Sequence, residues 1–458
     1  YYMCGICGLV YNELSRKVDE EQVLKMCETI RHRGPDDGGT YVKGNVGLGF
    51  RRLAIIDLSP TGHQPMCNED GTVWIAFNGE VYNYLELRED LIKKGHTFRS
   101  RSDTETIIHL WEEEGERCVE KLRGMFAFAI WDSNKQSLFL ARDREGKKPL
   151  FYAEMNDRLI FGSEIKTIMQ DKEFQAAPDL EAIHHYLAYQ SVPAPYSAFK
   201  GVKKLPPAHT MLYRNGRISL RRYWKLSYAN KRVIRTPQDE LNLQEEIIER
   251  LREAVKIRLM SEVPLGAFLS GGIDSSIVVA LMAGLSEQPV KTFSIGFVNE
   301  EYNELPYARM VAERYGTEHH EFVVTPDAQS IFPELVWHYN EPFADSSAIP
   351  TYYVSKLARE YVTVILTGDA GDENFAGYPR YQFDGDYQLR SKLSYALKRF
   401  AKGNPLTGAF FNPKDPFGTF KRLMGLNQQR LLYYLRITHF HEQYQNCLLY
   451  TSDAADEE

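Results

Sequence analysis

The sequence predicts an α/β protein with two folded parts, a four-layer α/β sandwich followed by a doubly wound parallel sheet. Two observations support this prediction: the first part reads as short strands with few helices, and the second alternates strands with helices. The chain has 458 residues, of which 43% are hydrophobic and 26% charged, so it can bury more than one core. A prior of ~150 residues per domain gives two or three domains.

The first part is rich in β-strands. One run within it, MFAFAIWD, is apolar at nearly every position, which is typical of a strand buried on both faces. Two amphipathic helices are expected, because apolar residues recur with helical spacing over 23–30 and begin to do so at 107–111. Two stacked sheets with helices outside them would satisfy both patterns. The expected strands are Val46–Phe50, Leu53–Asp57, Val73–Asn78, Met125–Asp132, Ser137–Asp143 and Leu159–Ser163.

The second part begins after a stretch in which prolines and charged residues break the pattern. We therefore expect a first domain over residues 3–205, a linker over 206–240 and a second domain over 241–446. Strand-like and helix-like runs alternate in the second domain, as in a parallel sheet with crossover helices. The strands are expected at Gly266–Leu269, Val290–Phe297 and Val362–Leu366, and the helices at Leu243–Leu259, Ser276–Gly284, Tyr307–Tyr315 and Pro350–Glu360. Residues 447–458 lose this periodicity, and a foreign tail is one explanation left open there.

Charge and composition exclude several classes of function. Lys and Arg number 55 against 62 Asp and Glu, and the resulting pI of about 6.0 argues against a nucleic-acid partner. We find no apolar run long enough to cross a bilayer and no signal-peptide pattern, so a cytoplasmic protein without a membrane partner is expected. The six cysteines are too few and too scattered for a disulfide scaffold.

A glycine-rich turn between a strand and a helix, SGGIDSS, is the most informative motif. Its glycines let the backbone approach an anion, its serines offer hydroxyl donors, and the helix that follows presents free N–H groups. The chain has no G-x-x-x-x-G-K-[ST] loop, and SGGIDSS instead resembles the loop of enzymes that split ATP into AMP and pyrophosphate. A simple turn between strand and helix is the alternative. The residues involved are Ser270, Gly271, Gly272, Asp274, Ser275 and Ser276.

A second loop, TGDAGDE, places three carboxylates after the strand that ends at Leu366. Open parallel sheets bind ligands at the carboxyl ends of their strands, and carboxylates there suit Mg²⁺ or a substrate ammonium. A solvated acidic turn is the alternative.

Cys4 lies close to the start of the chain, in Met3-Cys4-Gly5-Ile6-Cys7-Gly8. A redox or zinc role for C-x-x-C lacks a second cysteine pair and a histidine at zinc spacing. Removal of Met3 would instead leave Cys4 with a free α-amine that can act as the base for its own thiol. If Tyr1 and Tyr2 are retained, that amine is blocked and the site is expected to be inactive.

Together these motifs resemble the glutamine-hydrolysing asparagine synthetases, over nearly all of 3–380. The resemblance implies an N-terminal nucleophile hydrolase (Ntn) domain that hydrolyses glutamine, and an ATP pyrophosphatase-like domain that adenylates aspartate. For the first site it implies Cys4 as nucleophile, Arg52 as carboxylate clamp, Asn78 and Gly79 as oxyanion donors, Glu80 as a lining residue and Asp103 as the ammonium partner. The alternatives are a surface ion pair for Arg52 and a hairpin turn for Asn78-Gly79.

For the second site, the resemblance implies that SGGIDSS binds pyrophosphate and that Asp369 lies beside the intermediate. The adenosine contacts would be Phe268, Ile295, Thr367 and Gly368, and the Mg²⁺ ligands Asp274 and Asp372. The second domain is expected to be truncated, because the family's domain normally continues further.

The expected function is therefore glutamine-dependent asparagine synthesis from glutamine, aspartate and ATP with Mg²⁺, with ammonia passing between the two sites. Relatives of this kind often form homodimers. Two alternatives stay open: an amidotransferase with another carboxylate acceptor, such as a sugar or cell-envelope precursor, and a non-catalytic glutamine- or nucleotide-binding module.

Overall fold

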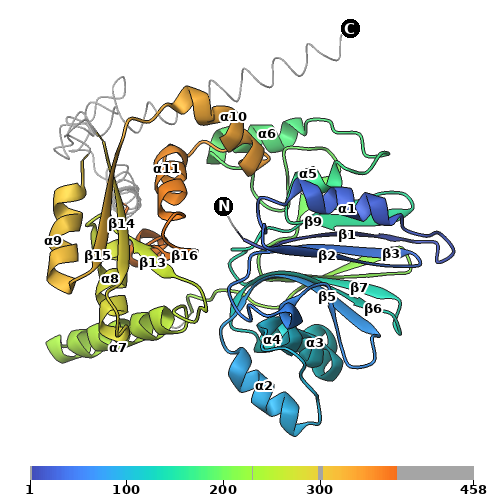
Figure 1. The fold of residues 1–458 in the computed structure, drawn as a ribbon, viewed down its shortest axis with the longest axis horizontal. Coiled ribbons are helices and arrows are strands. Elements are labelled where there is room, and N and C mark those ends of the chain that lie inside the picture. Colours follow the sequence, from blue (N-terminus) through green and yellow to red (C-terminus); the bar gives the residue numbers. More distant parts are fainter. Residues whose placement is uncertain (1–2, 230, 298–302, 379–458) are drawn as a thin grey trace, which may run out of the picture. The chain divides into compact units, whose positions relative to one another are not determined.

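The computed structural model describes residues 3–229, 231–297 and 303–378. Its contacts divide the chain into two compact units, residues 1–367 and 368–458, and each is considered by itself. The first unit contains two stacked antiparallel sheets and a separate parallel sheet (Figure 1). The predicted fold class, a sandwich plus a doubly wound sheet, is confirmed.

In the first sheet of the sandwich, β1 lies between β9 and β3. This strand, which follows Cys4, is buried on both faces. Ile6 and Val10 of β1 face the second sheet, whereas Cys7 and Leu9 face the outer helices. In spatial order the strands are β10 (Val202–Lys204), β8 (Phe151–Glu154), β9 (Arg158–Gly162), β1 (Gly5–Tyr11), β3 (Val46–Arg52) and β2 (Asp37–Lys43).

The second sheet contains the MFAFAIWD run as β6, with β5 and β7 on either side. Its side chains alternate between two cores: Phe126 and Phe128 pack toward the outer helices, and Ala127 and Ala129 pack between the sheets. The prediction of a strand buried on both faces is confirmed. In spatial order the strands are β12 (Arg217–Arg222), β11 (His209–Arg214), β7 (Ser137–Arg142), β6 (Gly124–Asp132), β5 (Val73–Val81) and β4 (Met66–Cys67).

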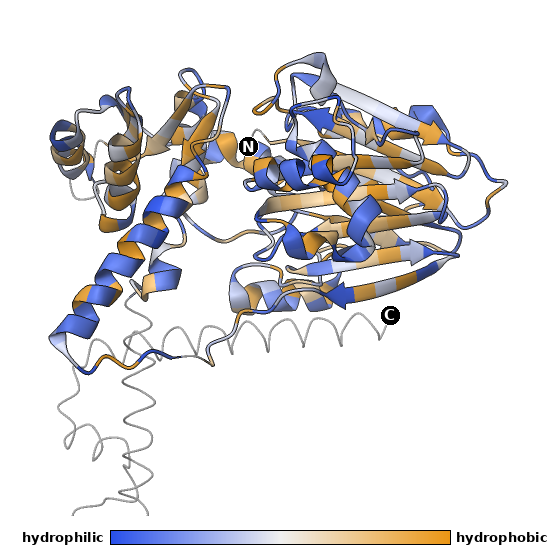
Figure 2. Ribbon diagram, turned by 90° about the horizontal axis from the view of Figure 1, so that it is seen from below, coloured by the Kyte–Doolittle hydropathy of each residue, from blue (hydrophilic) through white to orange (hydrophobic). Residues whose placement is uncertain are grey.

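Helices cover both outer faces, which completes the four layers. One core joins the first sheet to α1 (Glu20–Thr29) and α5 (Ile165–Ile168), and another joins the second sheet to α2 (Tyr84–Lys93), α3 (Asp103–Glu114) and α4 (Cys118–Lys121). A further helix, α6 (Leu180–Tyr189), follows the first sheet in the chain. Figure 2 shows that hydrophobic residues are concentrated on the strands of the sandwich.

The predicted strand Leu53–Asp57 is wrong, since the segment is irregular. Its backbone groups bind side chains instead of another strand: the carbonyls of Ile56 and Asp57 accept hydrogen bonds from Arg52. The sandwich also continues to Arg222 in β12, beyond residue 205 where the sequence suggested a linker.

The parallel sheet has helices on both faces, as a doubly wound fold requires. Its strand order is β15 (Glu318–Val324), β14 (Lys291–Phe297), β13 (Leu265–Phe268) and β16 (Val364–Leu366). One face packs against α7 (Pro237–Lys256), α8 (Ile273–Leu285) and α9 (Leu305–Tyr315), and the other packs against α11 (Ala348–Ala358). The sequence patterns did not predict β15 or α10 (Ala328–Tyr339).

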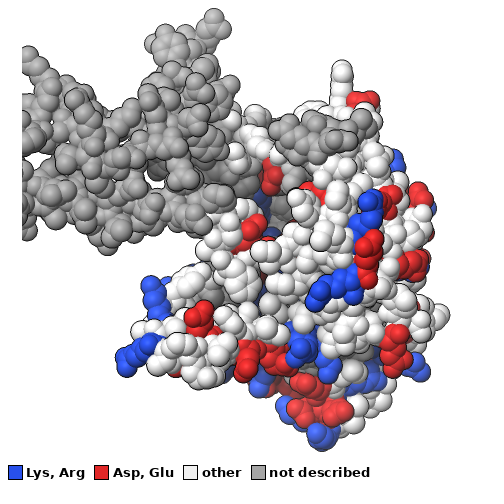
Figure 3. Space-filling model, turned by 90° about the vertical axis from the view of Figure 1, so that its left-hand side faces the viewer, with Lys and Arg blue, Asp and Glu red and all other residues white. Residues whose placement is uncertain are grey.

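Within the second unit the structure describes only residues 368–378, which contain the short helix α12 (Gly371–Phe375). The expected end of the second domain and the suggested tail lie outside the described residues. Among the helices that are described, none combines the length and the apolar character that a bilayer span needs. Figure 3 shows acidic and basic side chains interspersed over the described part of one face, without a continuous basic patch there.

Candidate active site

Cys4, Arg52, Gly79, Glu80 and Asp103 line one cavity of the sandwich. They come from distant parts of the chain: the residue before β1, the end of β3, the middle of β5 and the first turn of α3. The folding of the two sheets therefore brings together five of the six residues that the sequence assigned to glutamine chemistry.

The Cys4 thiol is held by the irregular segment after β3. Its Sγ accepts a hydrogen bond from the backbone N–H of Leu53 at 3.3 Å and lies 3.5 Å from the Leu53 carbonyl. Burial raises the pKa of the Cys4 thiol to about 11, against the opposing effect of the Leu53 hydrogen bond. At neutral pH the thiol is protonated, so a base is needed before it can attack a carboxamide.

Arg33 fixes the main chain at Cys4. Its Nε donates to the Cys4 carbonyl at 3.1 Å, and its Nη1 pairs with Glu164 at 2.9 Å. Both partners of this ion pair are buried, so the geometry at the start of β1 is set by a charge-assisted contact.

Arg52 is buried but is bound only to neutral oxygens. Its guanidinium donates to the carbonyls of Ser59 and Ile56, each at 3.3 Å, and to that of Asp57. Among the residues that the structure describes, no carboxylate lies within ion-pair distance of Arg52. With 7% of the residue exposed, the surface ion pair considered as an alternative is wrong.

Gly62 makes room for this guanidinium. A Cβ on Gly62 would lie 2.1 Å from Nη2 of Arg52, so a side chain there would displace it. The free charge of Arg52 beside Cys4 suits the α-carboxylate of an amino acid.

Asn78 and Gly79 lie in the middle of β5, paired with Ala127 and Phe126 of β6. The hairpin turn considered as an alternative is therefore wrong. Asn78 is 1% exposed, and among the residues that the structure describes neither its Oδ1 nor its Nδ2 has a hydrogen-bond partner. By the two-residue period of a strand, Asn78 faces the same inter-sheet core as Ala76, against which Cys4 also packs. A buried and unpaired amide near the thiol is suited to bind a developing oxyanion.

Asp103, which is buried, and Glu80, which is half-buried, bring two carboxyl groups to the same cavity. Asp103 accepts a hydrogen bond from the backbone N–H of Val81 at 2.8 Å, yet burial raises its pKa to about 6. Burial, reinforced by the charge of Asp103, raises the pKa of Glu80 well above its usual value. A substrate ammonium would supply the charge that these groups lack.

Lys148 and Gln64 belong to this environment, although no sequence motif singled them out. Burial lowers the pKa of Lys148 to about 8, against the influence of Glu80. Gln64 lines the cavity, donates to Thr104 at 3.1 Å and accepts from the N–H of Phe77 at 2.7 Å. Both stand in loops without a recognisable spacing, so only the three-dimensional structure places them.

The SGGIDSS loop joins β13 to the N-terminus of α8, as predicted. Hydroxyl groups hold it in shape: Ser270 and Ser275 lie 3.0 Å apart through their Oγ atoms, and Ser276 donates to the Gly272 carbonyl at 2.7 Å. Gly271 has a φ of 84°, and a Cβ there would lie 2.5 Å from the nitrogen of Ala308. The loop is thus folded with its backbone close to α9, and no side chain caps the start of α8.

The remaining predicted ATP contacts are divided between the two units. Phe268 and Ile295 are half-buried against one apolar cluster of the parallel sheet, and Thr367 follows β16, the neighbour of β13. Gly368, Asp369 and Asp372 belong to the second unit, where the Asp372 carbonyl accepts from the N–H of Gly377 at 3.0 Å. The ATP and Mg²⁺ roles of all these residues, including Asp274, stay predictions.

Two family models match the chain, "Glutamine amidotransferase domain" over residues 3–224 and "Asparagine synthase" over residues 246–456. The chain is 42% identical to "Asparagine synthetase [glutamine-hydrolyzing] 1" of Bacillus subtilis, over 87% of this chain and 62% of the relative. It is 39% identical to "Putative asparagine synthetase [glutamine-hydrolyzing] 2" of Methanocaldococcus jannaschii, over 82% and 76%. It is 33% identical to "Amidase chry2" of Gibberella zeae, over 93% and 68%.

The chain thus spans about three fifths of the Bacillus subtilis relative and about three quarters of the archaeal one. Both domain types lie in the order that the sequence motifs predicted. The chain belongs to the family of glutamine-hydrolysing asparagine synthetases.

Proposed function

We propose that the protein is a glutamine-dependent asparagine synthetase, which hydrolyses glutamine at Cys4 and transfers the ammonia to aspartate activated by ATP. The observation that supports this most directly is the shared cavity of Cys4, Arg52, Glu80 and Asp103 in a chain of this family. ATP, aspartate and Mg²⁺ at the second site, and a cytoplasmic homodimer, are parts of the proposal that follow from family membership alone.

In the proposed first reaction, Arg52 binds the α-carboxylate of glutamine and Asp103 binds its α-ammonium. The α-amine of Cys4, exposed once the preceding residues are removed, takes the thiol proton while Sγ forms a bond to the carboxamide carbon. The oxyanion would be bound by the side-chain amide of Asn78 and the backbone N–H of Gly79. The protonated α-amine then returns this proton to the leaving nitrogen as the C–N bond breaks and ammonia leaves. Water hydrolyses the resulting thioester to glutamate and regenerates the thiol.

In the proposed second reaction, the SGGIDSS loop binds the pyrophosphate portion of ATP. The uncapped start of α8 and the loop hydroxyls provide donors for the phosphate oxygens. The aspartate carboxylate attacks the α-phosphate and releases pyrophosphate, and ammonia then displaces AMP from the acyl-adenylate. Mg²⁺ bound by Asp274 and Asp372 would neutralise phosphate charge.

The test compares the wild-type protein with Cys4→Ala, after N-terminal sequencing has established that Cys4 is the first residue. We expect wild type to form asparagine, AMP and glutamate from glutamine, aspartate and ATP. Cys4→Ala should lose glutamate formation and keep asparagine formation from ammonia. Absence of aspartate-dependent AMP release from both proteins would overturn the proposal.

A different acceptor is the second candidate, because a relative named as an amidase aligns with 93% of this chain. Glutamate release that is accompanied by AMP formation only with another carboxylate acceptor would support that candidate. Stabilisation by glutamine without glutamate formation would indicate a binding module instead.

A further inference from the structure

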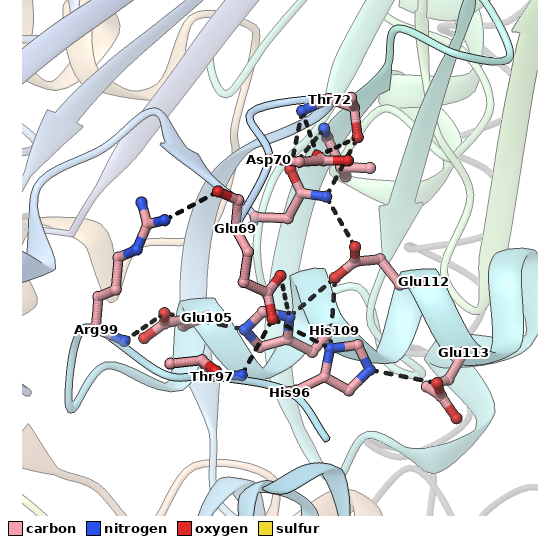
Figure 4. A network of polar contacts seen from close by, with 12 residues as sticks. Glu69, Asp70, Thr72, His96, Thr97, Arg99, Glu105, His109, Glu112 and Glu113 are labelled. Atoms are coloured by element: carbon pink, nitrogen blue, oxygen red, sulfur yellow. Dashed lines mark hydrogen bonds and ion pairs between the residues drawn. The ribbon is translucent and has the colours of Figure 1, made fainter. Parts of the chain in front are cut away.

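A cluster of two histidines and two glutamates lies on the outer helical layer of the sandwich. His109 and Glu112 come from α3, His96 from the segment between α2 and α3, and Glu69 from the loop between β4 and β5. Figure 4 shows the four side chains pointing toward one another. None of these residues lines the cavity that contains Cys4.

One ligand atom from each residue can be chosen so that all four lie within 4.8 Å of one another, which approaches the size of a tetrahedral metal site. Nδ1 of His109 lies 2.9 Å from Oε2 of Glu112 and 3.4 Å from Oε2 of Glu69. Nδ1 of His96 lies 3.4 Å from the other oxygen of Glu69, Oε1, and 3.8 Å from Oε2 of Glu112. Tetrahedral zinc with bonds of ~2.0 Å to nitrogen and oxygen requires ligand atoms about 3.3 Å apart. The observed separations lie on both sides of this value.

The outer nitrogens of both histidines are directed at carboxylates. Nε2 of His96 lies 3.3 Å from Glu113, and Nε2 of His109 lies 3.9 Å from Glu105. His109 is 1% exposed, and its Nε2 has no hydrogen-bond partner among the described residues. Metal-bound histidines usually donate their second N–H to a carboxylate, which fixes the ring and the tautomer.

The two glutamates are also oriented by neighbours. Asn68 donates to Oε1 of Glu112 at 2.8 Å, and this leaves Oε2 facing the histidines. The backbone N–H of Thr97 donates to Glu69 at 3.1 Å. Three of the four side chains therefore have an outer hydrogen-bond partner, and the fourth, His109, faces the Glu105 carboxylate at 3.9 Å. The cluster thus has the oriented surroundings of a metal site rather than those of a loose acidic patch.

We propose that Glu69, His96, His109 and Glu112 bind a divalent transition-metal ion, with Zn²⁺ as the expected metal. Two imidazoles and two carboxylates suit zinc, and the two carboxylates balance its charge. The ion would join three segments of the outer layer and brace α3, whose first residue is Asp103. This proposal does not depend on the proposed function.

A proton is the competing occupant. Burial opposes protonation of His109, but the nearby carboxylates of Glu105 and Glu112 outweigh it and raise the pKa of His109 to about 9. An imidazolium held by these carboxylates would account for the cluster without a metal, so the experiment must distinguish the two.

The experiment measures Zn²⁺ binding to the full chain by calorimetry and by metal analysis after dialysis. Glu112→Gln and His96→Gln remove ligands at accessible positions and avoid the fully buried His109. Glu113→Gln removes an outer partner of His96. Glu114→Gln is the matched control: it changes the next residue of α3, which has no contact with the cluster among the described residues. The two side chains are similarly exposed, 31% for Glu113 and 32% for Glu114. Co²⁺ in place of Zn²⁺ reports tetrahedral coordination through its visible absorption.

We expect zinc binding to be lost in Glu112→Gln and His96→Gln, weakened about 10- to 100-fold in Glu113→Gln, and unchanged in Glu114→Gln. Zinc should raise the melting temperature of wild type and of Glu114→Gln only. Absence of zinc binding by the folded wild-type protein would overturn the proposal in favour of the protonated cluster. Equal zinc binding by all the variants would overturn it as well, by placing the metal elsewhere.

Discussion

Replacing Asn78 with alanine should separate activity from stability in the sandwich. The side chain is buried, yet both of its polar atoms lack partners, so its amide is desolvated without compensation in the free protein. If Asn78 is an oxyanion donor, its hydrogen bond forms only as the substrate reacts. Its removal should therefore slow glutamine hydrolysis without unfolding the protein.

Asn78→Ala is expected to lower kcat but not the free energy of unfolding. Loss of one oxyanion donor lowers kcat about 10²- to 10³-fold, which corresponds to ~2.7–4 kcal/mol. An unpaired buried amide costs about 1–3 kcal/mol of folding free energy, and Asn78→Ala regains this amount. A residual cavity of about 40 Å³, at ~24 cal/mol per Å³, costs roughly 1 kcal/mol. The free energy of unfolding should then be unchanged or rise by up to about 2 kcal/mol.

The assay measures kcat for glutamate formation and the free energy of unfolding by urea titration, in protein whose first residue is Cys4. Asn45 is the matched control: it is 6% exposed in the same sandwich, but its Nδ2 donates to the Tyr11 carbonyl at 2.8 Å. Asn45→Ala should lose stability and keep kcat. A kcat for Asn78→Ala within threefold of wild type would refute the reasoning, as would a loss of stability equal to that of Asn45→Ala.

Four further predictions concern the two sites. Gly62→Ala should raise the KM for glutamine at least about tenfold and spare ammonia-dependent synthesis, because the new Cβ would lie 2.1 Å from Nη2 of Arg52. Equal loss of both activities would contradict this prediction. Burial raises the pKa of Asp103 to about 6, so the carboxylate needed for the substrate ammonium becomes protonated as the pH falls below 6. The KM for glutamine should then rise up to about tenfold per pH unit. A pH-independent KM between pH 5 and 7 would exclude that role. The same raised pKa favours the folded state at low pH, and this stabilisation is lost as pH rises through about 6, so Asp103→Asn should be more stable than wild type at pH 8 in urea titrations. Gly271→Ala should abolish ATP-dependent pyrophosphate release and keep glutamate formation, because a Cβ there meets the backbone of α9 at a φ of 84°; retained pyrophosphate release would rule out the loop as the phosphate site.

Local sequence patterns predicted the strands and helices whose side chains pack into one buried core or another. The β6 run was recognisable because its alternate residues face two different cores, and α8 was recognisable because it follows a glycine-rich turn. The predicted strand Leu53–Asp57 was wrong for a reason that no local pattern contains. Some of its backbone hydrogen bonds go to Arg52, the preceding residue, but others go to Cys4 and Glu262, distant side chains that the fold brings there.

Motifs singled out the residues that are proposed to react or to bind charge, and missed those that orient them. Nothing in the sequence connected Arg33 with the Cys4 carbonyl or with Glu164. Lys148 and Gln64 lie in loops, and their contacts are with residues from other parts of the chain. The His-Glu cluster escaped for the same reason, because its ligands come from three segments with no metal-binding spacing.

Two residues that line the cavity of the sandwich, and their neighbour Asn78 in β5, have polar or ionic requirements that the free protein leaves unmet. Arg52 has no carboxylate partner among the described residues, Asn78 has an unpaired amide, and Asp103 has a raised pKa. Each deficit is the counterpart of one part of glutamine: its α-carboxylate, its reacting carboxamide and its α-ammonium. An analogue that lacks either charged group would leave a buried charge unpaired, which costs more than the loss of one contact. We therefore infer that the site selects glutamine chiefly by the penalty for leaving these groups unpaired, and that the same deficits lower the stability of the unliganded domain.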